Sequence, residues 1–163
     1  MKNHNFLDFV YLDSPLGLLE LYASDSRLVE VRFGDKKIPK VESSLKILKQ
    51  AQQELIEYFA GKRFVFTVPT MQTGTAFQTA IWQQLAAIPY AKTISYAKLA
   101  SAVGKPKACR AVGITNGLNK LPIIIPCHRV VGKNGSIGGY SAGVWRKEWL
   151  LCHEQKHKLV LGD

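Results

Sequence analysis

The chain changes character near residue 70, and this change limits the folds that it can adopt. Up to that point, short apolar stretches are separated by turn residues, which is typical of strands. Beyond it, apolar residues recur three and four positions apart, which is typical of helices. A chain of 163 residues is long enough for two small domains. We therefore predict an α/β domain at 1–70 and a mainly helical domain at 71–163, joined at Pro69–Gly74.

The first domain combines strands with one helix. A helix is predicted at 43–60, where apolar residues share one face, and Gly61 is expected to end it. A further strand is predicted at Phe64–Val68. The strands of the antiparallel meander that precede the helix are predicted at 6–12, 17–23 and 27–33.

Two short helices in the second domain predict a helix-turn-helix. Ser95 caps the first helix, Tyr96–Val103, and Gly104 ends it. Pro106 suits the first turn of the second helix, 106–117. Such a motif presents the N-terminal end of its second helix to DNA, although basic helix pairs also occur in plain helical domains. The basic residues at that end are Lys105, Lys107 and Arg110. The other predicted segments are a helix capped by Thr75, a glycine-rich loop at 132–143 and a helix at 144–154.

Positive charge is concentrated in the second domain. Residues 1–70 carry 10 Lys and Arg against 9 Asp and Glu, whereas residues 71–163 carry 12 against 3. A basic half of this kind favours a polyanionic partner, and nucleic acid fits a helix-turn-helix. Small basic proteins also carry scattered lysines without such a partner, so the charge alone leaves both interpretations open.

The cysteine count and the length of the apolar stretches bear on the cellular compartment in which the protein works. Three cysteines, an odd and low number, argue against a disulfide framework. Phe6–Leu12 is too short for a signal peptide and is interrupted by Asp8. No apolar stretch has the length of a membrane span. We therefore expect a cytoplasmic protein, or a nuclear one in a eukaryote, with no membrane partner.

Residues 126–130 are Pro-Cys-His-Arg-Val, and they follow the apolar run Leu121–Ile125. A thiolate is a nucleophile whose reactivity depends on surroundings that lower the thiol pKa. Cys127, with His128 beside it, is therefore a candidate nucleophile. A cysteine after an isoleucine-rich segment is also a common small core residue. The motif alone leaves both interpretations open.

Two segments match a known family with high specificity, Arg-Ala-Val-Gly at 110–113 and Pro-Cys-His-Arg-Val at 126–130. They resemble the O6-alkylguanine-DNA alkyltransferases, and the resemblance covers nearly the whole chain. It implies an N-terminal ribonuclease-H-like α/β scaffold domain and a winged-helix-like C-terminal domain that contains the helix-turn-helix. The other matching segments are Ser14–Gly17, Tyr58–Gly61, Gly74–Gln78, Ile88–Tyr90, Thr93, Ser95-Tyr96, Leu99-Ala100, Gly138–Ser141 and Lys147–Glu154.

The resemblance implies direct-reversal DNA repair. An alkyl group would pass from the O6 oxygen of guanine, or from O4-alkylthymine, to the thiolate of Cys127. His128 would activate the thiol through a water, and Glu154 would orient His128. Tyr96 would help to rotate the nucleotide out and would protonate the guanine ring, while Asn119 would hold the active-site segment by backbone hydrogen bonds. The thioether product has no route to cleavage, so we expect one transfer per molecule and no cofactor.

The implied partner is double-stranded DNA, bound through its minor groove by a monomer. The damaged base must leave the stack before a buried sulfur can reach it. Arg110 would fill the vacated space, although an arginine is also an ordinary phosphate ligand. Ser141 would place its N–H near the departing oxygen, and the carbonyls of Cys127 and Val130 would accept from the guanine amino group. The other residues expected to contact DNA or the base are Tyr96, Ala111, Gly113, Gly138 and Tyr140.

Three positions depart from the family pattern. Lys120 stands where the family usually has proline, which would either loosen the segment before Cys127 or add a phosphate contact. Ala142 stands where glycine is usual, which would change the size of the pocket near bulky alkyl groups, and Ala76 stands where proline is frequent. No metal is expected, because the Cys-His pairs at 127–128 and 152–153 match no standard zinc spacing. The alternative functions are a non-catalytic DNA-binding module, a cysteine hydrolase and a transcription regulator. The cysteine motif counts against the first and third, and the basic half counts against the second.

Overall fold

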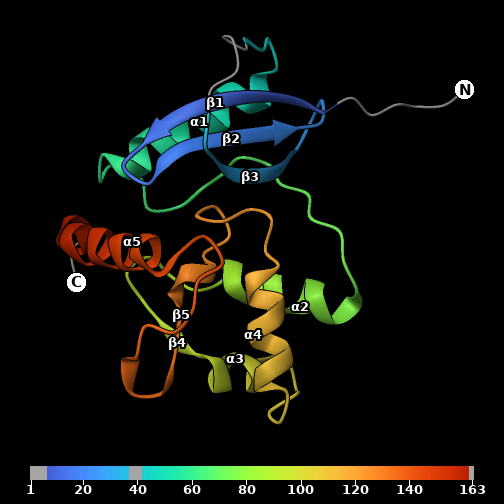
Figure 1. Ribbon diagram of the computed structural model, residues 1–163, viewed down its shortest axis with the longest axis vertical. Helices are drawn as coiled ribbons and strands as arrows, with labels where there is room; N and C mark the ends of the chain where they lie inside the picture. Colours follow the sequence, from blue (N-terminus) through green and yellow to red (C-terminus); the bar gives the residue numbers. More distant parts are fainter. Residues whose placement is uncertain (1–6, 37–41, 162–163) are drawn as a thin grey trace, which may run out of the picture. The chain divides into compact units, whose positions relative to one another are not determined.

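The computed structural model describes residues 7–36 and 42–161. The chain divides into two compact units, Met1–Gln72 and Thr73–Asp163 (Figure 1). Each unit has a different architecture, and each is described separately.

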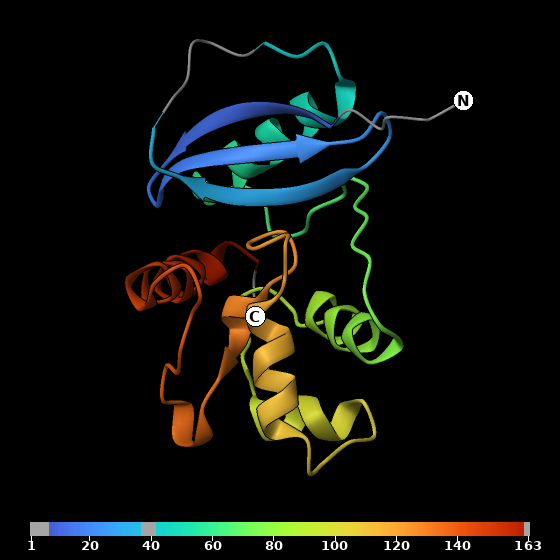
Figure 2. The same cartoon turned by 45° about the vertical axis from the view of Figure 1, so that its right-hand side comes forward.

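The first unit is a three-stranded antiparallel sheet that packs against one helix (Figure 2). Its strands are β1 (Asp8–Ser14), β2 (Gly17–Ala23) and β3 (Leu28–Gly34), in the order β1-β2-β3. Helix α1 spans Lys46–Phe59 and contacts all three strands. The predicted meander is confirmed. The sheet and helix form a core of alternate strand residues and one helix face, namely Leu19, Leu21, Ala23, Leu48, Ala51, Leu55 and Tyr58.

Helix α1 begins at Lys46, whereas the sequence predicted a start at residue 43. The hydroxyl of Ser43 accepts the backbone N–H of Leu45 at 3.1 Å and donates to the carboxylate of Asp8. A serine that bonds to a nearby backbone N–H in this way competes with helix formation. The helix ends as predicted, because Gly61 adopts a φ of 72°.

The predicted strand at Phe64–Val68 is wrong, since this segment has no strand pairing in the described chain. Its backbone N–H groups bond instead to the carboxylate of Glu54 on α1. Glu54 accepts from the N–H of Thr67 at 2.9 Å and from that of Val68 at 3.1 Å. The segment looks like a strand in sequence because its residues are apolar, but a buried helix carboxylate satisfies its donors.

The second unit is mainly helical. Helix α2 (Ala76–Ala86) begins after Thr75, which forms the predicted N-cap and a capping box with Gln78. Helix α3 (Tyr96–Ala102) begins after Ser95, whose hydroxyl accepts the N–H of Lys98. The remaining elements are β4 (Ile94–Ser95), α4 (Cys109–Gly117), η1 (Cys127–Arg129), β5 (Val130–Val131), η2 (Lys133–Gly135), α5 (Val144–His157) and η3 (Lys158–Leu161).

The second helix of the helix-turn-helix begins later in the sequence than predicted. Helix α4 begins at Cys109, and Pro106 lies in a turn before it. The N–H of Lys105 bonds to the carbonyl of Ala100, and the N–H of Ala108 bonds to the carbonyl of Lys105, both at 2.9 Å. These bonds close the turn around the proline. Helices α3 and α4 contact each other, as both Figure 1 and Figure 2 show.

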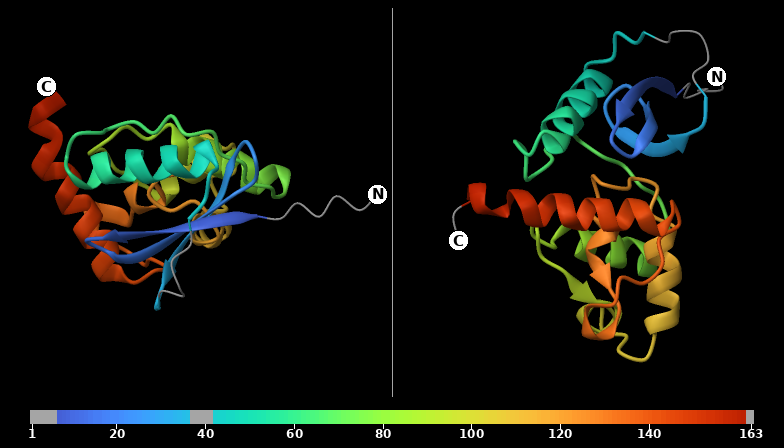
Figure 3. Two further views of the ribbon diagram at one scale, coloured as in Figure 1. Left: turned by 90° about the horizontal axis from the view of Figure 1, so that it is seen from above. Right: turned by 60° about the vertical axis from the view of Figure 1, so that its left-hand side comes forward.

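Two further features of this unit differ from the sequence prediction. Strands β4 and β5 form a parallel pair in which Ile94 faces Val130, and two residues are too few to show a strand pattern. Helix α5, red in Figure 3, runs to His157, whereas the sequence predicted an end at 154. It contacts η1. No helix of the described residues is long and apolar enough to cross a membrane. The core of the unit consists of Ile81, Trp82, Leu85, Ile88, Leu99, Ala100, Val112, Cys127 and Val130.

Candidate active site

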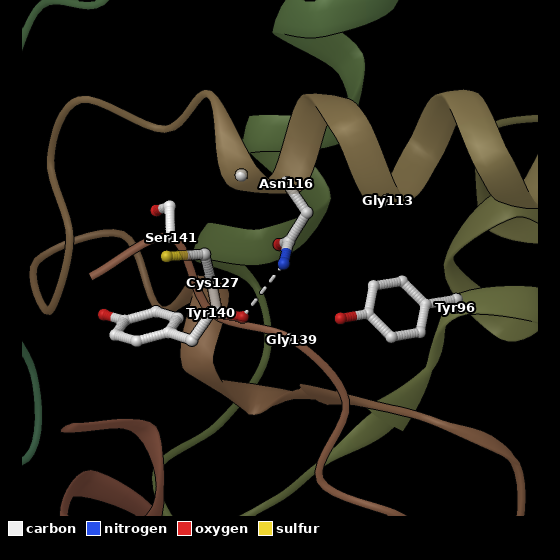
Figure 4. Close-up of a pocket in the computed structure, with 8 residues that line it drawn as sticks. Tyr96, Gly113, Asn116, Cys127, Gly139, Tyr140 and Ser141 are labelled. Atoms are coloured by element: carbon white, nitrogen blue, oxygen red, sulfur yellow. Dashed lines mark hydrogen bonds between the residues drawn. The ribbon is translucent and has the colours of Figure 1, made fainter. Parts of the chain in front are cut away.

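A pocket of about 200 Å³ opens beside Cys127 (Figure 4). Its size is below the ~300–1,000 Å³ of pockets that take drug-sized ligands, so it suits a single planar ring system. Cys127 is therefore both a core residue and a pocket residue. Its side chain belongs to the hydrophobic core, and its sulfur borders the cavity. The residues that line the pocket are Tyr96, Gly113, Asn116, Gly117, Cys127, Gly139, Tyr140 and Ser141.

The segment before Cys127 is held in an unusual conformation. Asn119 bonds to both of its ends, donating from Nδ2 to the carbonyl of Ile125 at 2.8 Å and accepting the N–H of Leu121 at 3.1 Å. Ile123 adopts a φ of 74°, which is costly for a β-branched residue. Burial of Ile123 and the two bonds of Asn119 stabilise this turn. Lys120, the departure from the family pattern, is exposed.

The Cys127 thiol is neutral in the free protein. Burial raises the pKa of the Cys127 thiol above its usual value, and this effect outweighs the opposing influence of its neighbours. Those neighbours are the side chains of Asn119 and Tyr140 and the positive charge of Lys147, each of which acts to lower this pKa. A base must therefore remove the thiol proton before the sulfur can attack.

Glu154 joins His128 and Arg129 in a buried network. Its carboxylate lies 2.7 Å from Nε2 of His128 and 3.0 and 2.9 Å from Nε and Nη2 of Arg129. The N–H of Ala91 donates to it at 3.1 Å, and Nη1 of Arg129 donates to the carbonyl of Ile88. Burial acts to raise the pKa of Glu154, but the bonds and charges of His128 and Arg129 outweigh it and hold that pKa at about 2.

The network fixes the tautomer of His128. Burial lowers the pKa of His128, so its ring is neutral near pH 7. Because an ionised Glu154 only accepts, the ring proton lies on Nε2 and Nδ1 carries a lone pair. Nδ1 has no hydrogen-bond partner among the described residues. His128 therefore presents an unoccupied proton acceptor, as a general base requires.

Lys147 places a buried cation at the same site. Its side chain is fully buried, and its ammonium donates to the carbonyl of Gly139 at 3.2 Å and lies 5.8 Å from the ring centre of Tyr96. Burial lowers the pKa of Lys147 to about 8, while the neighbouring Cys127 thiolate would act to raise it. The cation lowers the pKa of the Cys127 thiol in return.

Tyr96 and the glycine-rich loop form other walls of the pocket. The hydroxyl of Tyr96 points into the pocket from α3 (Figure 4). Burial and the nearby Cys127 raise the pKa of Tyr96, so the hydroxyl keeps its proton at neutral pH. A Cβ at Gly139 would meet no atom within 4 Å, whereas one at Gly138, whose φ is 70°, would lie 3.3 Å from the Tyr96 hydroxyl. Gly139 therefore leaves empty space in the pocket.

The structure brings most of the predicted site residues to the pocket or to the network behind it. The pocket holds Cys127, Tyr96, Gly113, Tyr140 and Ser141, and Asn119 holds the segment beside it. His128 and Glu154 form the buried network behind it. Arg110 and Ala111 lie on the exposed face of α4, outside the pocket, and Val130 is buried in β5. Gly138 is exposed in the loop, where it adjoins Tyr96.

Sequence reasoning missed several residues of the site, among them Arg129, Lys147 and Asn116. Arg129 lies inside the Pro-Cys-His-Arg-Val motif, so its position was a signal for a role. Lys147 begins the last matching segment, but nothing in its sequence context shows that it is buried. Asn116 lines the pocket, and its helical spacing from Arg110 and Gly113 was the only available signal. No group of three or more metal-ligating side chains occurs among the residues that the structure describes.

Comparisons with known proteins agree with this geometry. Residues 9–72 match the model of the 6-O-methylguanine DNA methyltransferase, ribonuclease-like domain, and residues 76–156 match that of the DNA binding domain of the same proteins. The structure is similar to the crystal structure of Mycobacterium tuberculosis OGT in complex with DNA, with a TM-score of 0.85 and 37% identity. That likeness covers 96% of this chain and 99% of the other. The predicted fold class is confirmed.

Curated relatives carry one name. A constitutive methylated-DNA–protein-cysteine methyltransferase of Bacillus subtilis is 55% identical over 94 residues, which are 58% of this chain and 57% of the relative. A methylated-DNA–protein-cysteine methyltransferase of Mycolicibacterium paratuberculosis is 37% identical over 155 residues, which are 93% and 94% of the two chains. The alignment with the Bacillus protein thus spans less than two thirds of that relative, while the second spans nearly all of its relative. The resemblance inferred from the motifs is confirmed, and this chain belongs to the 6-O-methylguanine DNA methyltransferase family.

Proposed function

We propose that this protein repairs alkylated DNA by moving an alkyl group from the O6 oxygen of guanine to the sulfur of Cys127. The observation that carries the proposal is the position of Cys127, whose sulfur borders a pocket of base size while its neighbour His128 presents a free Nδ1. A nucleophile, a base and an oriented carboxylate are thus present in one unit. The names of the relatives support the same reaction.

The transfer is a displacement at carbon. His128 accepts the thiol proton at Nδ1, directly or through a water, and Glu154 stabilises the imidazolium that forms. The thiolate attacks the alkyl carbon, a carbon–sulfur bond forms, and the carbon–O6 bond breaks with its electron pair passing to the guanine. Tyr96 donates a proton to the guanine ring, and the N–H of Ser141 bonds to the departing oxygen. Lys147 stabilises the thiolate before the attack.

The substrate must be a base that has left its helix. A pocket lined by core residues cannot admit a duplex, so the nucleotide has to be flipped out at a cost of a few kcal/mol. Arg110, exposed on α4, fills the vacated position in the stack, with the helix in the minor groove. Ala111 and Gly113 are small enough for the helix to approach DNA closely. O4-alkylthymine is a second candidate substrate of the same chemistry.

The product limits each molecule to one reaction. A thioether at Cys127 is chemically stable, and the Pro-Cys-His-Arg-Val motif offers no route to cleave it. The protein is therefore both catalyst and acceptor, acts as a monomer and needs no cofactor. All three cysteines are free, which supports a cytoplasmic location with this function.

Intact-protein mass spectrometry tests the proposal. The protein is incubated with a duplex that contains one O6-methylguanine, and we expect the protein mass to rise by one methyl group in place of one hydrogen. The unmodified duplex and the Cys127→Ser variant are the controls, and neither should give the shift. Absence of the adduct with the methylated duplex would refute the proposed function, and repeated turnover would identify a hydrolase instead.

A further inference from the structure

The side chain of Asn116 is buried in the pocket wall with its acceptor oxygen unpaired among the described residues. It is 5% exposed, and its Nδ2 donates to the carbonyl of Cys127 at 3.2 Å. Its Oδ1 has no hydrogen-bond partner among the described residues. Figure 4 shows the amide of Asn116 reaching from α4 toward the middle of the pocket.

The orientation of this amide is fixed by its partner. A backbone carbonyl only accepts, so the NH₂ group of Asn116 must face Cys127. Rotating the amide by 180° would bring two acceptor oxygens together, which is unfavourable. The oxygen Oδ1 is therefore held as a buried acceptor that faces no donor of the described residues.

An unpaired buried acceptor costs free energy, and a ligand that supplies a donor recovers it. The chemistry of the base identifies that donor. Alkylation at O6 removes the proton from N1 of guanine, and N9 is bonded to the sugar. The 2-amino group is then the only N–H donor that the base retains. O4-alkylthymine retains none, because alkylation removes its N3 proton.

We infer that Asn116 determines base specificity, with Oδ1 accepting a hydrogen bond from the 2-amino group of the flipped O6-alkylguanine. This inference rests on the proposed function. The amino group has two hydrogens, so Asn116 takes one of them in place of the Val130 carbonyl, and Val130 is not among the residues that line the pocket. The carbonyl of Cys127 has a second lone pair, so it accepts the other hydrogen while Asn116 donates to it. Asn116 thereby favours damaged guanine over O4-alkylthymine and over 6-alkoxypurines without the amino group.

The test compares two bases that differ only in that amino group. Single-turnover transfer rates are measured with single-stranded oligonucleotides that carry O6-methylguanine or O6-methylhypoxanthine, for the wild type and for Asn116→Ala and Asn116→Leu. We expect the wild type to react faster with O6-methylguanine than with O6-methylhypoxanthine. In each variant the ratio of these two rates should be about tenfold smaller. Leucine is branched at Cγ as asparagine is and leaves no cavity, so Asn116→Leu separates the loss of the acceptor from the loss of packing.

A purely structural role gives a different result. If Asn116 only holds Cys127, both rates fall together and the ratio of rates is unchanged, which would overturn the inference. Asn119→Ala is the matched control, because it loosens the Cys127 segment without facing the base, and its ratio should equal that of the wild type. Where a variant is too slow to measure, its affinity for the two oligonucleotides in the Cys127→Ala background gives the same comparison. Failure of the wild type to react with either base would instead refute the proposed function.

Discussion

Removing the charge of Glu154 should destabilise the second unit by about 3 kcal/mol. The pKa of Glu154 is about 2 in the folded protein against an ordinary value of 4.5, and at 1.36 kcal/mol per unit this difference corresponds to about 3 kcal/mol. Glu154→Gln also leaves the buried guanidinium of Arg129 without its counter-charge, and such a loss costs ~3–5 kcal/mol. The carboxylate is 1% exposed, so solvent screens little of this effect.

Urea unfolding followed by tryptophan fluorescence measures this effect. The three tryptophans are Trp82, Trp145 and Trp149, and all lie in the second unit, so the signal reports that unit. Glu148→Gln is the matched control, because it removes the same charge from an exposed position on the same helix. It should change the unfolding free energy by less than about 0.5 kcal/mol.

The effect of Glu154 should also depend on pH. Its folded pKa lies below its unfolded pKa, so its stabilising contribution is complete above pH 4.5 and is lost as the pH falls toward 2. The difference between wild type and Glu154→Gln should therefore shrink over that interval. A variant within about 1 kcal/mol of the wild type at pH 7 would refute the reasoning about the buried network.

Three further changes test other parts of the site. Gly139→Ala places a methyl group in empty pocket space, so melting should be unchanged while the transfer rate falls; an unchanged rate would mean that the base does not occupy this space. Lys147→Met removes the cation that lowers the Cys127 pKa, so the pH profile of iodoacetamide alkylation at Cys127 should move to higher pH, by about one unit and tenfold in rate at pH 7; a profile that superimposes on that of the wild type would contradict this. Arg110→Ala should slow transfer from duplex DNA more than transfer from the free base O6-methylguanine, and equal losses would remove its flipping role. Wild-type affinity for DNA should fall steeply with salt, and a flat response would argue against phosphate contacts.

Local signals predicted much of the fold. Thr75 and Ser95 cap the helices that they were expected to cap, and Gly61 ends α1, because each of these residues acts through its own backbone or a neighbour within a few positions. The Phe64–Val68 segment was mispredicted because its donors bond to Glu54, a residue more than ten positions away. Apolar composition cannot show a tertiary hydrogen bond of this kind.

The site also contains residues that the sequence predicted and residues that only the fold reveals. The motif around Cys127 predicted a nucleophile and its histidine, and the resemblance added Glu154; the structure brings these three residues into one site. The unused acceptor of Asn116 and the buried ammonium of Lys147 were not predictable, because each depends on which side chains the fold places around it. Both residues are of types that usually lie at the surface, so only the packed structure shows that they face the pocket.

Peptide mapping after reaction with O6-methylguanine DNA tests the central claim most directly. Trypsin separates the three cysteines into the peptides Ala108–Arg110, Leu121–Arg129 and Glu148–Lys156. We predict one methyl group per protein molecule, carried by Leu121–Arg129, with no further uptake when fresh methylated DNA is added. A methyl group on either other peptide, or a Leu121–Arg129 peptide that regains its free thiol, would contradict the account.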